Sequence, residues 1–371
     1  MLKLRASYGI GGNIGRNTAP YLIASYYDSS LVDGMAGSVN TPPNKDIRWE
    51  KTTTVNVGVD FALFRHRLSG TIEYYNKYSV DLLAAINGSP TQGFGYTTLM
   101  TNNGKMVNRG VEITLSGEII RQKDFSWNAS LLYAFNRNKV KHISVQPSLW
   151  DSRISMPTSY PMVGKPLYGI YAYKWAGLNE NGDPQVYDAE NNVTSGPARD
   201  YHALVYCGTT VPIHNASLTN VLRYKGFEFS AMLILDAGHK LRSSNIPSIN
   251  MSNGRITSTA KGIVDRWTQP GDVTDVPRLL FSNDTENFNT HRTELYRYSD
   301  LFVYDASNIR LSNISLAYRV PAHWCKKISL SGARLQFNVE NVATFAFDSK
   351  ANYDLGGKVK PNYGWGLYLN F

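Results

Sequence analysis

The chain has 371 residues, of which 42% are hydrophobic, 12% aromatic and 18% charged, and its formal net charge is +9. The charged fraction lies below the roughly 25% of soluble domains, and no apolar run approaches the roughly 18 residues that a transmembrane helix needs. Basic residues are scattered without a run of five, which argues against a nucleic-acid-binding protein. Two cysteines are too few for a disulfide framework or a metal cluster.

The first predicted strand begins at the amino end of the chain. In LKLRASYG, residues 2–9, apolar and polar side chains alternate with the period of two that is typical of a β-strand. This pattern follows Met1 directly, with no secretory signal before it. We therefore expect the chain to be a piece of a longer protein.

The same alternation returns along the rest of the chain. In TVNVGVDFALF, residues 54–64, Val55, Val57 and Val59 share one face. The break at 65–67 has the size of a hairpin turn and leads into the next strand. The further segments with this pattern are 68–74, 111–119, 125–135, 216–224, 227–236, 309–318, 328–340 and 363–371.

Two of these segments change phase by one residue. Ile309 and Leu311 alternate, and the apolar pattern then continues one residue out of step at Ile314; Leu330 and Leu335 show the same slip. Either a β-bulge intervenes, or part of the strand leaves its apolar environment. The sequence leaves both explanations open.

Short and long connections alternate between the predicted strands, which indicates a transmembrane β-barrel with short periplasmic turns and long outer loops. A conservative count gives about twelve strands, of which the weakest lie near 168–188, and the abundant tyrosine and tryptophan suit aromatic girdles. The short turns are 65–67, 121–124, 225–226 and 321–327, and the long stretches are 10–49, 84–104, 137–167, 189–213, 237–305 and 342–362.

This topology makes a prediction about the cysteines. Cys207 falls in an outer loop and Cys325 in a periplasmic turn. The membrane would separate them by far more than the roughly 7 Å that a disulfide allows between Cα atoms. We expect both thiols to be unpaired within the chain.

One loop has helical spacing. In residues 253–267, Ile256, Ala260 and Ile263 fall on one helical face together with Val264 and Trp267, and Asn253 is placed to cap the start. A short helix that packs its own loop is the plainer interpretation, and a helix that contacts a partner protein is the alternative.

Three short motifs resemble ligand sites but lack essential parts. The glycines of residues 9–15 miss the last glycine of a dinucleotide fingerprint and predict the start of a flexible loop. Asn179, Asn181 and Asp183 alternate as in a calcium loop, but Pro184 stands where an EF-hand needs glycine. A polar turn is therefore predicted, with a cation site of another kind as the alternative.

The third motif, Ser258 with Lys261, has none of the companion motifs of penicillin-recognising enzymes. The seven histidines are scattered, and none has serine spacing that suggests a nucleophile and base. The sequence therefore predicts no catalytic residue, no metal site, no cofactor and no enzyme activity.

Aromatic side chains are frequent in the predicted loops. Interleaved with polar residues, they suit recognition of a sugar or a peptide, since a flat ring stacks on a sugar face or a peptide plane. Packing of one loop on another explains them equally well. They are Tyr21, Tyr26, Tyr27, Phe94, Tyr96, Trp150, Tyr160, Tyr201, Phe281 and Phe288.

Taken in order, several segments are similar to the carboxyl-terminal barrel of SusC/RagA-type TonB-linked outer-membrane transporters. The similarity spans nearly the whole chain. Each block alone is weak evidence for this family, but the blocks in this order are specific to it. They are LKLRASYG, the run IRWEKTTTVNVGVDFALFRHRLSGTIEYYNKYSVDLL, NNGKMVNRGVEITLSGEI, RYKGFEFSAM, DRWTQPGD, YDASNIRLSNISLAYRVP and YGWGLYLNF.

The resemblance implies an antiparallel transmembrane β-barrel of about 22 strands closed by a plug, in the outer membrane of a Gram-negative bacterium of the Bacteroidetes type. It implies import of bulky nutrients, with oligosaccharide the first candidate and peptide the second. The implied partners are a SusD-like surface lipoprotein, the TonB complex and the barrel-assembly machinery. The ligand itself and its binding residues stay unknown.

The chain is shorter than a transporter of that family. Residues 1–371 correspond to the carboxyl-terminal part of a barrel, with no plug domain, no signal peptide and roughly ten strands fewer than expected. An unpaired strand edge in lipid is costly, so we expect that the chain alone does not transport. Two alternatives remain: a complete smaller pore or adhesin closed between the first and last strands, and a soluble all-β carbohydrate-binding module with its apolar faces in a core.

The last strand is the clearest of all. PNYGWGLYLNF, residues 361–371, ends in a phenylalanine after strict alternation. Similar outer-membrane proteins end in such a strand, which the barrel-assembly machinery recognises. The residues expected to face lipid and to serve assembly are Tyr363, Trp365, Leu367, Leu369 and Phe371.

Overall fold

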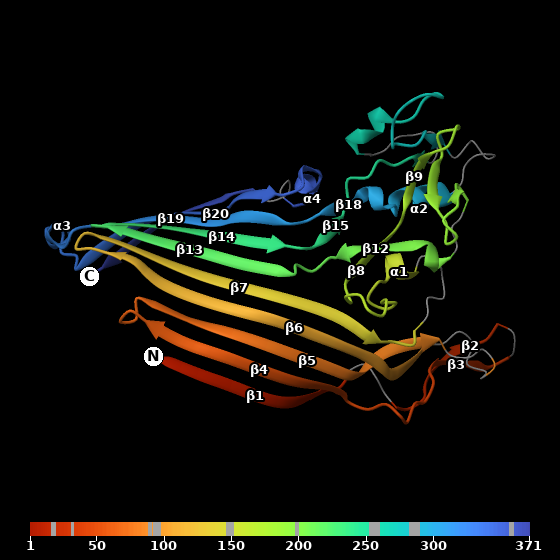
Figure 1. Ribbon diagram of the computed structural model, residues 1–371, viewed down its shortest axis with the longest axis horizontal. Helices are drawn as coiled ribbons and strands as arrows, with labels where there is room; N and C mark the ends of the chain where they lie inside the picture. The colour runs from red at the N-terminus through yellow and green to blue at the C-terminus, as the bar shows by residue number, and fades with distance from the viewer. Residues whose placement is uncertain are drawn as a thin grey trace.

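One curved antiparallel sheet of ten strands dominates the computed structural model, and its strands follow one another in chain order (Figure 1). The structure describes residues 1–15, 20–30, 33–87, 91, 98–145, 152–196, 200–251, 260–281, 290–355 and 360–371. The ten strands are β1 (Leu2–Asn13), β4 (Glu50–Leu63), β5 (Leu68–Asn87), β6 (Thr98–Arg121), β7 (Phe125–His142), β13 (His214–Tyr224), β14 (Phe227–Ala237), β19 (Asn308–Arg319), β20 (Gly332–Ala346) and β21 (Asn362–Asn370).

The register of this sheet collects the apolar residues on one face. Because side chains alternate between faces, a row of paired residues across the sheet shares one side. One such row is apolar across nine strands, and the row beside it is mostly polar. The apolar row is Leu4, Val59, Ile72, Ile113, Tyr133, Ala216, Leu235, Ile309 and Phe345, and its neighbour is Arg5, Gly58, Glu73, Glu112, Ala134, Asn215, Asp236, Asn308 and Ala346.

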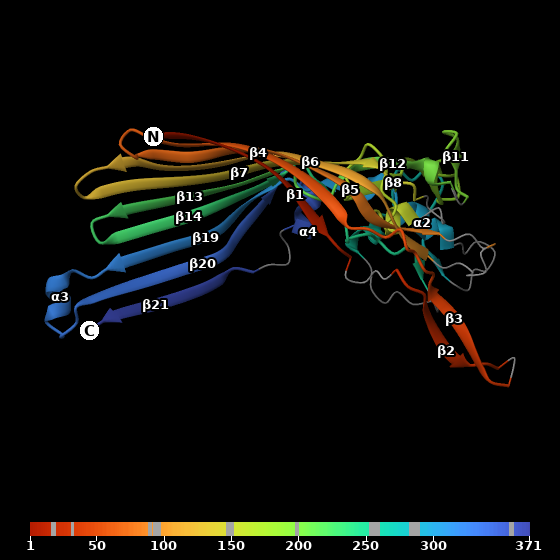
Figure 2. The same cartoon turned by 90° about the horizontal axis from the view of Figure 1, so that it is seen from below.

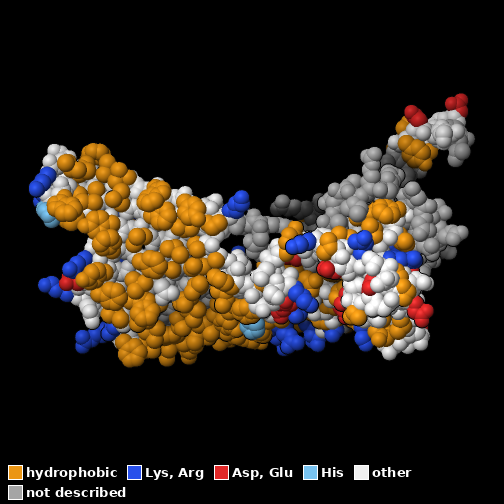
Figure 3. Space-filling view, turned by 90° about the horizontal axis from the view of Figure 1, so that it is seen from above, with side chains coloured by type: hydrophobic (Ala, Val, Ile, Leu, Met, Phe, Trp, Pro, Cys, Tyr) orange, Lys and Arg blue, Asp and Glu red, His pale blue; other side chains and the backbone are white. Residues whose placement is uncertain are grey.

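The apolar face is exposed rather than packed against a second layer. Leu4 is 75% exposed, Ile72 43% and Phe345 59%. Figure 3 shows this surface as a broad apolar area over the strands, with basic side chains gathered at its edges. An exposed apolar band of this size is typical of a lipid-facing barrel wall and excludes the soluble module, which needs these faces in a core.

The two edges of the sheet are β1 and β21, and they are not paired with each other in the described part of the chain. Figure 2 shows them at opposite margins of the curved sheet. A complete smaller barrel would need these two strands to be neighbours, and the structure gives that alternative no support.

The strand count differs from the predicted twelve. The segments near 168–188 form β8 (Gly169–Tyr173), β9 (Trp175–Leu178) and β10 (Pro184–Tyr187), which belong to small sheets outside the ten-stranded one. The reason is visible in their burial, since all five residues of β8 are buried and show no lipid-facing side. These strands belong to the loop structure and add nothing to the wall.

A β-bulge explains the first slip of phase. The pairing of β19 shifts between Leu311 and Asn313: Ser312 is the extra residue relative to β14, whereas two residues of β20, Asn341 and Val342, lie opposite it on the other side. The second slip has another cause, because Leu330 lies before β20 and is buried in the preceding turn. The phase slip in 309–318 is therefore caused by a bulge, and the slip in 328–340 arises because Leu330 belongs to a turn and not to the strand.

All short turns lie at one end of the sheet with both termini, and the long connections lie at the other (Figure 1). The turn before β20 carries a short helix, α3 (Ala322–Lys326). Cys325 lies in α3, whereas Cys207 lies in β12 (Leu204–Thr209) among the long connections, and both are free thiols. The predicted alternation of turns and loops is confirmed.

The long connections pack into a separate layer with its own core. In its small sheets β8 pairs with β12, and β10 lies between β9 and β11 (Val193–Thr194). β15 (Lys240–Arg242) pairs with β18 (Val303–Asp305), and β16 (Asn250–Met251) pairs with β17 (Leu280–Phe281). Buried aromatic and aliphatic residues hold the layer together. They include Tyr171, Tyr173, Val186, Leu295, Ile249, Tyr296 and Phe302. We call this part of the molecule the loop layer.

Short helices complete the structure: α1 (Ser152–Ser155), α2 (Thr290–Arg297) and α4 (Asn352–Leu355), with single 3₁₀ turns between strands. Among the described residues, no helix has the length and the apolar character required to cross a membrane. Of the segment 253–267 with its predicted helix, the described residues 260–267 contain a 3₁₀ turn, Lys261–Asp265; Asn253 and Ile256 lie outside the described residues.

Candidate ligand-facing surface

The polar face of the sheet begins with an ionic cluster near the amino edge. Arg5 donates from Nε to Asp60 at 2.8 Å and from Nη2 to Glu73, and the Thr71 hydroxyl donates to Asp60 at 2.9 Å. These side chains come from three adjacent strands on the face opposite the apolar band. In a barrel this face lines the lumen, so water or a luminal domain would solvate the charges.

Glycine allows close packing on this polar face. An added Cβ at Gly110 would overlap the ring of Tyr75 and approach the Phe135 carbonyl oxygen to 2.5 Å. The tyrosine lies across the glycine of the neighbouring strand, since Tyr75 pairs with Gly110. The arrangement covers the exposed backbone of a glycine with an aromatic ring.

The flexible loop predicted for residues 9–15 is wrong over most of its length. Residues 9–13 continue β1, and Gly9 to Asn13 pair with Thr54 to Glu50. Hydrogen bonds to β4 determine the structure here, because they pair the backbone N–H and C=O groups of the glycines and hold this segment as a strand.

The loop layer is organised around a buried ionic cluster. Asp183, which precedes β10, accepts from Arg278 Nη2 at 2.8 Å and from Arg292 Nε at 2.7 Å. The Arg292 side chain is only 4% exposed, and burial lowers the pKa of its guanidinium. Arg292 also donates to the Arg278 carbonyl at 2.8 Å and to the Asn250 side chain. One carboxylate thus joins segments that are about a hundred residues apart in sequence.

The same cluster answers the question of the calcium-like motif. The Asn179 side-chain oxygen accepts from the backbone N–H of Asn181 and of Asp183, which makes a polar turn as predicted. The Asp183 carboxylate is neutralised by arginines and has no free charge for a cation. Within the described residues no group of three or more metal-ligating side chains is found.

A second arginine fastens the loop layer by hydrogen bonds to carbonyl groups. Arg242 donates to the Tyr171 carbonyl at 2.7 Å, to that of Arg297 at 3.1 Å and to that of Ser299 at 3.2 Å. Burial lowers the pKa of Arg242 and raises that of Tyr171. Three separate segments therefore meet at one side chain.

The predicted loop aromatics differ in how exposed they are. Tyr21, Tyr26 and Tyr27 are 76%, 72% and 54% exposed, on or beside the projecting hairpin of β2 (Ile23–Asp28) and β3 (Met35–Thr41). Tyr201 packs against the core of the loop layer instead. Tyr160 and Phe281 are half-buried, and Phe94, Tyr96, Trp150 and Phe288 lie outside the described residues.

A cavity of about 510 Å³ opens between the loop end of the sheet and residues 156–167. Its walls are mainly aliphatic and thioether side chains, with Glu50, Lys105, His142 and Tyr160 as the charged or titratable ones. Apolar lining residues include Leu82, Leu83, Met100, Met106, Val140, Ile143 and Met156. Nothing in the sequence marked this cavity, because its residues come from five separate segments of the chain.

Four of the residues predicted for assembly lie on β21, at one edge of the sheet, and Phe371 follows its last residue, Asn370. Trp365 is 83% and Phe371 93% exposed, and Phe337 of the neighbouring strand packs against Trp365 with ring centroids 4.3 Å apart. Tyr363, Leu367 and Leu369 are exposed on the same face. The described residues of β21 therefore form an exposed apolar face.

The family model described as TonB dependent receptor-like, beta-barrel, matches residues 1–342. TonB-dependent receptor P3 of Formosa agariphila is 26% identical over 392 residues, which cover 98% of this chain and 37% of that protein. TonB-dependent receptor SusC of Bacteroides thetaiotaomicron is 26% identical over 361 residues, which cover 92% of this chain and 34% of SusC.

A solved structure described as the RagAB peptide transporter has the same fold over 100% of this chain and 41% of its own, with a TM-score of 0.75 and 24% identity. The chain thus spans between a third and two-fifths of the length of these relatives. The exposed apolar band and the alternation of turns and loops agree with the match. The chain belongs to the TonB-dependent receptor family, and it forms part of a SusC-like β-barrel of the outer membrane.

Proposed function

We propose that residues 1–371 form the carboxyl-terminal wall and outer loops of a TonB-dependent importer of bulky nutrients, with oligosaccharide as the first candidate ligand. The observation that carries this proposal is the position of the loop layer. It is a packed structure held at one end of a membrane wall, where a ligand from outside arrives first. Loops on a rigid scaffold commonly carry binding residues.

The exposed tyrosines support a carbohydrate ligand. Tyr21, Tyr26 and Tyr27 lie with their rings in solvent on the loop side, where an aromatic ring can stack on a sugar face. Neither a buried cofactor nor a catalytic pair is needed for this role. We accordingly propose a transport protein without enzyme activity.

The partners follow from the proposed role. A SusD-like lipoprotein would cover the loop layer from outside, and the TonB complex would act through a plug contributed by the rest of the protein. The barrel-assembly machinery would engage β21, whose apolar face ends at Phe371. Since β1 and β21 are the edge strands of the wall in the described part of the chain, we propose that this chain alone does not transport. Oligosaccharide uptake by cells that produce only this chain would contradict that.

The ligand proposal is tested by uptake in cells that produce the complete barrel. Replacing Tyr21, Tyr26 and Tyr27 by alanine should lower the apparent affinity for a labelled oligosaccharide about tenfold or more, since each aromatic contact contributes roughly 0.5–1.5 kcal/mol. The matched control is Tyr353→Ala, another exposed tyrosine, on α4. Equal uptake by the triple variant and the control would refute the role of these tyrosines.

A peptide ligand is the second candidate, favoured by the cavity of about 510 Å³. Its aliphatic and methionine lining suits apolar amino-acid side chains better than sugar hydroxyls, which need hydrogen-bonding partners when buried. Met106→Asp would place a charge in this cavity. Loss of labelled-peptide uptake with oligosaccharide uptake unchanged would favour the peptide, and the reverse pattern would favour the oligosaccharide.

A further inference from the structure

We propose that the outer side of β7, at its loop end, binds the phosphate group of a lipid headgroup in the membrane leaflet next to the long loops. The strand itself gives the first argument. Leu131, Tyr133 and Phe135 belong to the apolar face, and the same side of the strand then continues with Arg137 and Lys139. At roughly 3.3 Å per residue, Arg137 follows Phe135 by about 7 Å. The outer face of β7 therefore changes from apolar to cationic between two successive residues on that face, Phe135 and Arg137.

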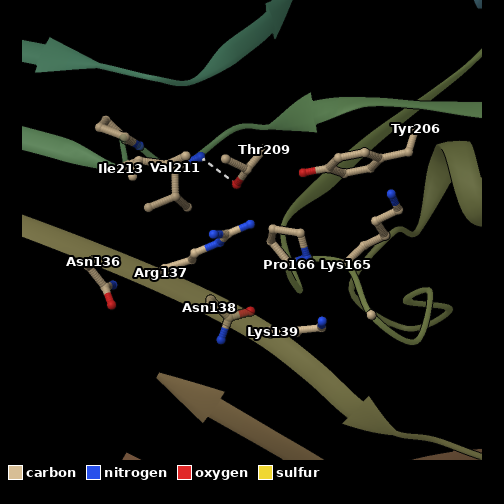
Figure 4. Close-up of a pocket in the computed structure, with 12 residues that line it drawn as sticks. Asn136, Arg137, Asn138, Lys139, Lys165, Pro166, Tyr206, Thr209, Val211 and Ile213 are labelled. Carbon is tan, nitrogen blue, oxygen red and sulfur yellow. Dashed lines mark hydrogen bonds between the residues drawn. The ribbon is translucent and has the colours of Figure 1, made fainter. Parts of the chain in front are cut away.

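The chain builds a pocket at this place, with a volume of about 200 Å³ (Figure 4). Arg137 extends into the middle of it, and Lys139 and Lys165 lie at its margin. Lys165 is brought there by backbone pairing with β7: the Val140 N–H donates to the Lys165 carbonyl at 2.9 Å, and the Gly164 N–H donates to the Val140 carbonyl at 2.9 Å. The position of the third cation is therefore fixed by the fold.

The lining contains no carboxylate among the described residues. Besides the three cations, it presents polar side chains of Asn136, Asn138, Tyr206 and Thr209. Its apolar residues are Pro166, Val211, Pro212 and Ile213. The ammonium of Lys165 lies 4.8 Å from the centre of the Tyr206 ring. Two lysines and an arginine without an acidic neighbour form a site that attracts an anion.

A fourth cation increases this excess. Arg109 of β6 stands directly opposite Arg137, and like charges directly opposite each other destabilise a sheet. Arg109 donates to the neutral side chain of Asn76 at 3.0 Å. No ion pair in the described part of the chain involves Arg109, Arg137, Lys139 or Lys165. A bound anion between the strands would offset this repulsion.

The depth of the pocket identifies the source of the anion. Just before it on the same face, the Tyr133 hydroxyl and the His214 Nδ1 are hydrogen-bonded at 2.9 Å, and the Phe135 and His214 ring centroids lie 5.3 Å apart. Aromatic side chains of barrels gather at the boundary between hydrocarbon and headgroups. Figure 3 shows basic side chains at the margin of the apolar surface on this side. This places Arg137 and Lys139, on the outer side of β7, at headgroup level.

The chemistry selects a phosphate monoester. Arginine can hold two phosphate oxygens in its planar fork, and lysines add point charges that favour the doubly charged group. The hydroxyl groups of Tyr206 and Thr209 are further polar groups of the pocket. The apolar residues beside them can contact the upper part of the acyl chains. A neutral headgroup would gain little from the same site.

The test uses the complete barrel, purified from outer membranes in detergent and titrated with single lipids in native mass spectrometry. The probes are dioleoyl phosphatidic acid, which is a phosphate monoester, dioleoyl phosphatidylcholine and inorganic phosphate. The variant is Arg137→Gln/Lys139→Gln/Lys165→Gln. With about fivefold in affinity for each cation near the surface, we expect the triple variant to bind phosphatidic acid about 100-fold more weakly.

The matched control removes the same charge at the other end of the wall: Arg65→Gln/Lys123→Gln/Lys326→Gln. It should bind phosphatidic acid as the unmodified barrel does. Equal losses in both triple variants, or no loss in the first, would overturn the proposal. Displacement of the lipid by inorganic phosphate at equal concentration would assign the pocket to a soluble anion and overturn the lipid assignment.

Should the triple variant fail to assemble, Lys139→Gln and Lys165→Gln separately should each weaken binding about fivefold. Arg137→Lys/Lys139→Arg/Lys165→Arg keeps every charge and should retain binding within about threefold. Unchanged binding in both single variants would refute the proposal. None of these outcomes depends on the nutrient, so the proposed transport function stands or fails by its own experiment.

Discussion

Asp183→Asn is the most informative single change in the loop layer, because one carboxylate there neutralises two arginines. The substitution keeps the size of the side chain and removes its charge. Arg292, whose side chain is 4% exposed, then loses its ion pair, whereas Arg278, at 24%, can still reach water. Burial already lowers the pKa of Arg292, which shows that its environment disfavours the charged form.

The expected cost follows from this difference in exposure. Breaking a buried ion pair by removing one partner costs about 3–5 kcal/mol. Asp183 keeps 18% exposure, so we take the lower end, about 3 kcal/mol, which corresponds to roughly a 100-fold change in an opening equilibrium. The loop layer has its own core, so the loss should be local to it.

Hydrogen exchange followed by mass spectrometry on the complete barrel measures this directly. Amides of β10 and α2 should exchange about 100-fold faster in Asp183→Asn, while those of β5 and β6 stay unchanged. Glu190→Gln, an exposed residue of the same loop, is the matched control. The double variant Asp183→Asn/Arg292→Met removes both charges and should recover part of the loss. A change of less than threefold in Asp183→Asn would refute the reasoning.

Gly110→Val should destabilise the wall by about 1–3 kcal/mol, measured as a lower unfolding temperature of the purified barrel, because its side chain would overlap Tyr75. Burial raises the pKa of Cys207 to about 11, so alkylation by iodoacetamide at pH 8 should be about 100-fold slower than for free cysteine. Burial also lowers the pKa of His239, against the opposing charges of Asp236 and Asp305. The stability that depends on neutral His239 is therefore present above about pH 6.5 and lost as the pH falls through the lowered pKa, which faster hydrogen exchange at 238–242 should reveal. Deleting Phe371 should reduce the amount of barrel inserted in the membrane several-fold, by quantitative immunoblot, without changing the unfolding temperature of the barrel that does insert.

Each of these four predictions has a control variant or a result that would contradict it. Gly9→Val, where an added Cβ meets nothing within 4 Å, should be tolerated far better than the change at Gly110. Rapid alkylation of Cys207 at pH 8 would show that its thiol is not desolvated. His239→Gln should abolish the dependence on pH, and an unchanged dependence would transfer it to another group. Normal insertion without Phe371 would argue against recognition of the terminal residue.

The wall was predictable because its signal is local. Side chains of a strand in a barrel wall alternate strictly between lipid and lumen. Val55, Val57 and Val59 therefore indicate both the strand and its lipid-facing side before any partner strand is known. The turns were predictable for the same reason, since each is bounded by two such strands. The bulge at Ser312 was visible as a slip of phase, and only pairing with both neighbours showed which explanation holds.

The loop layer was not predictable from the same pattern, because contacts between distant segments decide it. β8 is buried on both sides by residues from elsewhere in the chain, so its apolar run predicts a wall strand although it belongs to the loop layer. Residues 9–13 looked like a flexible glycine loop, but a ladder with β4 fixes them. The sequence by itself determined the family, the membrane wall and the end at which the loops lie, since these depend on alternation along the strand. Only the tertiary structure decided the Asp183 cluster, the aliphatic cavity and the cationic pocket beside Arg137, since each of these sites is assembled from segments that the sequence keeps apart.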